Sequence, residues 1–120
     1  FGHSRGGGAS LNYVLTHPFK VQVIVLNSTG YPVDVLRRAS EVDIPVLMIH
    51  GTENNPDEGG SPLSNIEMAR QFEVALRTAN KDVEVKYYEG SGHNAIFNTP
   101  GQLDDTVQRV SDFLRRKLFK

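Results

Sequence analysis

Two short apolar segments constrain the fold of this chain more than any other feature. Residues 21–26 (Val-Gln-Val-Ile-Val-Leu) and 45–50 (Pro-Val-Leu-Met-Ile-His) are rich in β-branched side chains and apolar at nearly every position. A strand with one solvated face alternates polar and apolar residues, whereas a nearly continuous apolar run is typical of a strand covered on both faces. The two segments therefore favour a parallel sheet with helices on both sides.

The segments between and after these strands predict helices and one more strand. Four segments have helical character, the last two with apolar residues at helical spacing. Residues 83–88 alternate as in a strand with one more solvated face, near a sheet edge. Ser64 and Glu67 are expected to form a capping box at the start of the third helix. The predicted helices are 9–16, 33–40, 64–79 and 103–118.

This alternation of helices and strands predicts the fold class. Residues 1–120 are expected to form a single α/β domain, with a mostly parallel sheet, right-handed crossovers and flanking helices. In open parallel sheets, functional residues collect where the strands end. Those ends lead into the loops 27–32, 51–62 and 89–99. From these loops, six residues are expected to border a substrate pocket: Asn27, Ser28, Tyr31, Asn94, Ile96 and Phe97.

The composition excludes several classes of function. Thirteen Lys and Arg stand against fourteen Asp and Glu, so no positive excess points to a nucleic acid or an anionic membrane as partner. There is no cysteine, which excludes disulfides, cysteine-ligated zinc and a thiol nucleophile. No apolar run approaches the roughly 20 residues of a membrane helix. Cysteine-free chains occur in the cytoplasm as well as among secreted proteins, so the compartment stays open.

The glycine-rich start of the chain carries a catalytic motif. Gly2-His3-Ser4-Arg5-Gly6 fits Gly-x-Ser-x-Gly, the nucleophile elbow, in which a serine stands on a sharp turn between a strand and a helix. Small residues on either side let the backbone double back. The amide of Arg5 would point toward a developing oxyanion at the positive end of the helix.

Two further signals follow downstream in the order serine, acid, histidine. The strand 45–50 ends in His50-Gly51, and Gly90-Ser91-Gly92-His93 follows the strand 83–88. With these motifs the chain resembles the C-terminal half of the α/β-hydrolase superfamily, most closely uncapped esterases of the dienelactone hydrolase and prolyl-oligopeptidase-like group. The resemblance implies Ser4 as nucleophile and His93 as general base. It implies no metal and no cofactor.

The acid of the triad departs from the family pattern. In the family an Asp usually stands three residues after the glycine of the His-Gly pair, and here that position holds Asn54. Family members often carry the acid a few residues before a proline that precedes the next helix, which favours Asp57. Glu53 and Glu58 are the alternatives. These acids could also form a solvated loop or bind a cation through oxygen atoms.

The resemblance begins at the elbow, so the family's earlier strands are expected to be missing. An elbow needs a strand that leads into it, and only Phe1 precedes Gly2. The neighbouring strand would then be a hydrophobic sheet edge. We therefore expect the chain to assemble with a second chain that carries the upstream strands, or to form a homo-oligomer. No cap domain fits between Ser4 and the acid, which favours small soluble esters as substrates.

Three functions are compatible with these features. The first is a serine carboxylesterase that acts on small esters through a Ser4–His93–acid triad and an acyl-enzyme. The second is a non-catalytic or incomplete hydrolase fold that serves binding or assembly, which Asn54 favours. The third is a flavodoxin-like or phosphate-binding domain that uses the glycine-rich start near Arg5. This third function leaves His93 unexplained.

Overall fold

The computed structural model describes residues 1–54 and 62–119. Within these ranges a parallel sheet has the order β1-β2-β3-β4, so neighbours in the sheet follow one another along the chain. The strands are β1 (Gly2–His3), β2 (Ile24–Asn27), β3 (Val46–Gly51) and β4 (Val83–Tyr88). The parallel α/β fold predicted from the sequence is confirmed, and β4 lies at an edge of this sheet as predicted.

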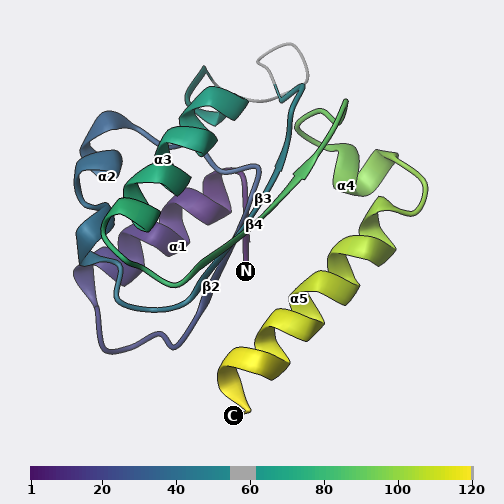
Figure 1. Ribbon diagram of the computed structural model, residues 1–120. Helices are drawn as coiled ribbons and strands as arrows, with labels where there is room; N and C mark the ends of the chain where they lie inside the picture. Colours follow the sequence, from purple (N-terminus) through teal and green to yellow (C-terminus); the bar gives the residue numbers. More distant parts are fainter. Residues whose placement is uncertain (55–61, 120) are drawn as a thin grey trace.

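Helices flank the sheet in two layers (Figure 1). The first three helices lie on one side, and α5 lies on the other. The helices are α1 (Arg5–Thr16), α2 (Val33–Arg37), α3 (Ile66–Thr78), α4 (Ala95–Asn98) and α5 (Gln102–Leu118), with short 3₁₀ turns at Ala39–Glu41 and Pro62–Ser64. None of the helices in the described ranges is long and apolar enough to cross a membrane.

The apolar strands face two cores at once, which explains their sequence. Leu26 and Met48 pack with Phe72 of α3 in the larger core. Alternating with them, Val25 and Leu47 pack with Phe113 of α5 on the opposite face of the sheet. Because successive side chains of a strand point to opposite faces, a strand between two helical layers needs apolar residues at every position.

Several element boundaries differ from the sequence prediction. Helix α1 begins at Arg5, four residues earlier than expected, because the chain enters it directly from β1. The predicted capping box is wrong, since Ser64 belongs to the preceding 3₁₀ turn and Asn65 caps α3. The side-chain oxygen of Asn65 accepts a hydrogen bond from the amide of Met68 at 3.0 Å. The loop 89–99 contains the short helix α4.

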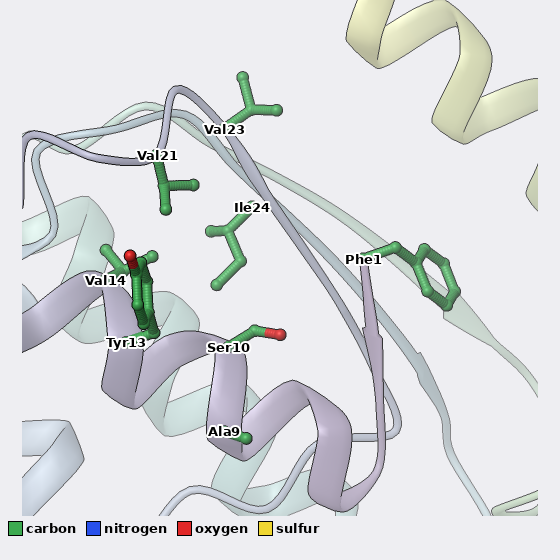
Figure 2. Close-up of a pocket in the computed structure, with 8 residues that line it drawn as sticks. All are labelled: Phe1, Ala9, Ser10, Tyr13, Val14, Val21, Val23 and Ile24. Carbon is green, nitrogen blue, oxygen red and sulfur yellow. The ribbon is translucent and has the colours of Figure 1, made fainter. Parts of the chain in front are cut away.

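Strand β1 is short and covers only part of the neighbouring strand β2. The sequence suggests no strand before Ser4, but Gly2 and His3 form β1 and pair with Leu26 and Asn27. Beside this short strand, a groove of about 350 Å³ opens between α1 and the segment that leads into β2 (Figure 2). Its lining is mostly apolar: Phe1, Ala9, Ser10, Tyr13, Val14, Val21, Val23 and Ile24.

Candidate active site

Ser4 stands on a strained turn between β1 and α1. Its backbone has φ 56° and ψ −117°, a conformation that non-glycine residues rarely adopt and that concentrates at functional sites. The amide of Ser4 donates to the carbonyl of Asn27 at 2.8 Å, which fixes the turn to the end of β2. A Cβ on Gly2 would lie 2.5 Å from backbone atoms of Gly6 and Gly7, so the turn requires glycine at position 2.

His93 reaches Ser4 from the far end of the chain. Its Nε2 lies 2.8 Å from the Oγ of Ser4, although 89 positions separate the two residues. The loop that carries His93 passes close to the end of β3, where a Cβ on Gly51 would lie 2.1 Å from the carbonyl oxygen of Ser91. Ser4 and His93 thus come together at the carboxyl ends of the strands, where parallel sheets place their functional residues.

Asn54 faces the other nitrogen of the His93 ring. Its Oδ1 lies 3.0 Å from Nδ1 of His93, and the hydroxyl of Ser64 donates to the same oxygen at 3.3 Å. Asn54 is only 3% exposed, and its Nδ2 has no hydrogen-bond partner among the described residues. An amide thus occupies the place beside the base that a carboxylate has in a Ser-His-Asp triad.

Of the three predicted acids, the structure describes Glu53 alone. Glu53 is exposed, and its amide donates to the carbonyl of Ser91 at 2.9 Å. Asp57, which the sequence favours, and Glu58 both lie outside the described residues, so their roles stay predictions. The family resemblance points to position 54, three residues after Gly51, where an amide stands in place of the expected acid.

Arg5 is the first residue of α1. The amides in the first turn of a helix have no partner within the helix, and the helix dipole makes this end positive. The amide of Arg5 thus belongs to a segment that favours a developing negative charge next to Ser4. Its role as an oxyanion donor remains a prediction.

His3 lies next to His93 and is held by hydrogen bonds of its own. Its Nδ1 accepts a hydrogen bond from Nδ2 of Asn27 at 2.9 Å, and its Nε2 lies 3.4 Å from Oδ1 of Asn94. The rings of His3 and His93 are 5.4 Å apart, and Phe97 packs edge-on against His3. Asn27 was predicted only as a pocket residue, and its contact with His3 could not be recognised from the sequence.

His93 and the nearby buried His50 each have a lowered pKa. Burial, and then the nearby charge of His3, lowers the pKa of His93. Burial also lowers the pKa of His50, which is 1% exposed and hydrogen-bonded through Nε2 to the carbonyl of Ser64. Neutral imidazole is therefore favoured at His93, and only the neutral ring can accept a proton.

The predicted substrate pocket is only partly consistent with the structure. Tyr31 is fully buried and stacks on Phe72 at 4.7 Å between ring centres, so it belongs to the core. Ile96 is buried, whereas Phe97 is 63% exposed beside His3. Within the described ranges, no group of three or more His, Asp or Glu side chains is placed to hold a metal ion.

Comparisons with known proteins identify the family and the fold of the chain. The family model for phospholipases and carboxylesterases matches residues 1–117. The fold is similar to dienelactone hydrolase from Anabaena variabilis (25% identity, TM-score 0.69, 98% of this chain and 48% of that chain). It is also similar to an esterase from Pyrococcus furiosus (18% identity, TM-score 0.75, 96% of this chain and 51% of that chain).

An acylaminoacyl peptidase from Pyrococcus horikoshii is also similar (17% identity, TM-score 0.79, 98% of this chain and 23% of that chain). No curated protein sequence matches. The chain spans about half the length of the esterase and the dienelactone hydrolase. The family match over nearly all residues shows that the chain belongs to the phospholipase/carboxylesterase family of the α/β-hydrolase superfamily.

Proposed function

We propose that this chain carries the catalytic serine and histidine of a carboxylesterase that acts on small esters. The observation that carries the proposal is the 2.8 Å contact between Oγ of Ser4 and Nε2 of His93. Two residues so far apart in sequence meet at the strand ends, one on a strained turn and the other buried. This arrangement of nucleophile and base is the one that acyl transfer requires.

The proposed reaction proceeds in two halves. His93 takes the proton of the Ser4 hydroxyl at Nε2 while Oγ bonds to the ester carbonyl carbon, and the amide of Arg5 stabilises the oxyanion. His93 then gives this proton to the leaving alcohol as the bond to the carbonyl carbon breaks, which leaves an acyl group on Ser4 and a neutral ring. In the second half, His93 accepts a proton from water, whose oxygen attacks the acyl carbon. Ser4 recovers its proton and the acid product departs.

A serine-reactive fluorophosphonate tests this proposal. Intact-mass analysis should show one adduct on the wild-type protein and none on Ser4→Ala, because only an activated serine displaces fluoride at a useful rate. Ser10→Ala is the matched control, since the Ser10 hydroxyl donates to the carbonyl of Gly6 in the same helix. It should be labelled like the wild type. Persistent labelling of Ser4→Ala, or a folded wild type without an adduct, would contradict the proposal, and the latter would favour the non-catalytic alternative.

We also infer that the groove beside β1 receives additional strands of the fold, which in the isolated chain come from a second copy of it. Strand β1 pairs with only two residues of β2, and apolar side chains line the groove (Figure 2). Phe1 is 65% exposed and Tyr13 is 46% exposed there. Similar solved structures of about twice the length support the same inference.

Size-exclusion chromatography of Tyr13→Lys tests the role of the groove. The wild-type chain should elute as an assembly, and Tyr13→Lys should dissociate it, because a charge would be buried in an apolar contact. Asn12→Lys, on the neighbouring exposed position of α1, should leave the assembly intact. A stable, active wild-type monomer of 13.3 kDa would refute the inference.

A further inference from the structure

The amide of Asn54 has a consequence for the chemistry of the site. This inference rests on the function proposed above. Asn54 is buried, and its Oδ1 contacts the base directly. Its Nδ2 has no hydrogen-bond partner in the described structure. A buried donor without a partner lowers the stability of the fold, so we expect Asn54 to have a functional role that offsets this cost.

The first part of that role is to fix the tautomer of His93. With Oδ1 toward the ring, Nδ1 of His93 carries the proton and donates to Asn54. The lone pair of Nε2 then faces the hydroxyl of Ser4. The opposite orientation of the amide would put the proton on Nε2, and His93 could no longer act as a base. In the orientation described, Oδ1 also accepts from Ser64, so the oxygen has two donors.

The second part concerns charge. An Asp in this place would stabilise the imidazolium that forms when His93 takes the proton of Ser4, and a neutral amide does so far less. His93 is also buried beside His3. Any transition state that needs a fully formed imidazolium is therefore costly at this site.

Leaving groups differ in how much they need that imidazolium. A poor leaving group, such as an alkoxide, must receive the proton from Nε2 as its bond to the carbonyl carbon breaks. The tetrahedral intermediate then exists beside a fully charged His93 ring until the proton is transferred. A good leaving group, such as a phenolate with electron-withdrawing substituents, departs as an anion, and the proton of Ser4 is only partly transferred when the bond breaks. The proton on His93 passes afterwards to solvent.

We propose that Asn54 orients His93 as a neutral base and thereby restricts the acylation of Ser4 to acyl donors whose leaving group is stable as an anion. Asn54 is then a positioning residue, and the substrate class is activated esters rather than alkyl esters or amides. The esterase function would be kept, with a steeper dependence of rate on the leaving group than a carboxylate would give.

The series para-nitrophenyl acetate, phenyl acetate and ethyl acetate tests this proposal in wild type and Asn54→Asp. The aspartate should raise kcat/KM for ethyl acetate on the order of 100-fold or more, the range of general acid–base catalysis. The gain for para-nitrophenyl acetate should stay below about 10-fold, since little proton donation is needed there. Asn12→Asp adds the same charge on an exposed position of α1 and should change neither rate.

Equal gains along the series, or no gain, would overturn the proposal. Fluorophosphonate labelling of wild-type Ser4 separates this failure from a failure of the esterase function. If the esterase function were wrong, Ser4 would not be labelled. Nitrogen NMR of the His93 ring adds a readout that a merely structural role would not move. The wild type should carry its proton on Nδ1, and Asn54→Ala should lose that preference. A wild-type proton on Nε2 would refute the proposal even if Asn54→Asp failed to fold.

Discussion

Replacing Ser4 or His93 by alanine should lower kcat for para-nitrophenyl acetate by on the order of 10⁴-fold, and replacing both should lower it no further. The two side chains are in direct contact and act as one unit, so removing the second side chain has no further effect on kcat once the first is gone. The expected loss is below the roughly 10⁶-fold of a complete triad, because Asn54 supplies no negative charge.

Steady-state kinetics of the two single variants and the double variant measure this effect. Ser10→Ala serves as control, because its hydroxyl bonds within α1, and it should keep wild-type turnover. Losses that multiply in the double variant would mean that Ser4 and His93 act independently. Such a result would not be consistent with proton transfer between them.

Gly2→Ala should destabilise the protein by about 1–3 kcal/mol, the usual cost of overpacking, and should abolish fluorophosphonate labelling. Its Cβ would collide with the backbone of Gly6 and Gly7 at 2.5 Å. Backbone cannot rotate aside as a flexible side chain can. The first turn of α1 must therefore move away from β1, and Ser4 lies on the connection between them.

Gly8→Ala is the matched variant on the same helix. A Cβ at Gly8 meets nothing within 4 Å, and alanine is favoured over glycine inside a helix by roughly 0.5–1 kcal/mol. Urea unfolding should therefore shift in opposite directions for the two variants. Equal shifts would mean that the close approach at Gly2 does not limit stability.

The sequence predicted the sheet well because its signals there are physical and local. Residues 21–26 and 45–50 are apolar at nearly every position since both faces of the sheet are covered, and that need is visible without coordinates. The strand β1 could not be predicted, because two residues form no pattern. Its pairing depends on Leu26 and Asn27, which lie far along the chain.

The site was predictable in its motifs and less so in its third member. The Gly-x-Ser-x-Gly motif and the Gly-Ser-Gly-His segment identified Ser4 and His93 as candidates, because each motif answers a backbone requirement. The partner of His93 depends on how the loop after β3 folds, which residue type alone does not encode. The family resemblance favoured Asp57, which lies outside the described residues. The described structure brings the amide of Asn54 to Nδ1 of His93.

Ser4 becomes reactive only when segments from both ends of the chain come together. Ser4, Asn54 and His93 follow β1, β3 and β4, and the contact between Ser4 and His93 closes a loop of 89 positions. Contacts of such long range form late in folding, after the entropy of the intervening chain has been lost. Nucleophilicity at Ser4 is therefore a property of the assembled sheet and not of the glycine motif. A partly folded chain would expose the same serine as an ordinary alcohol.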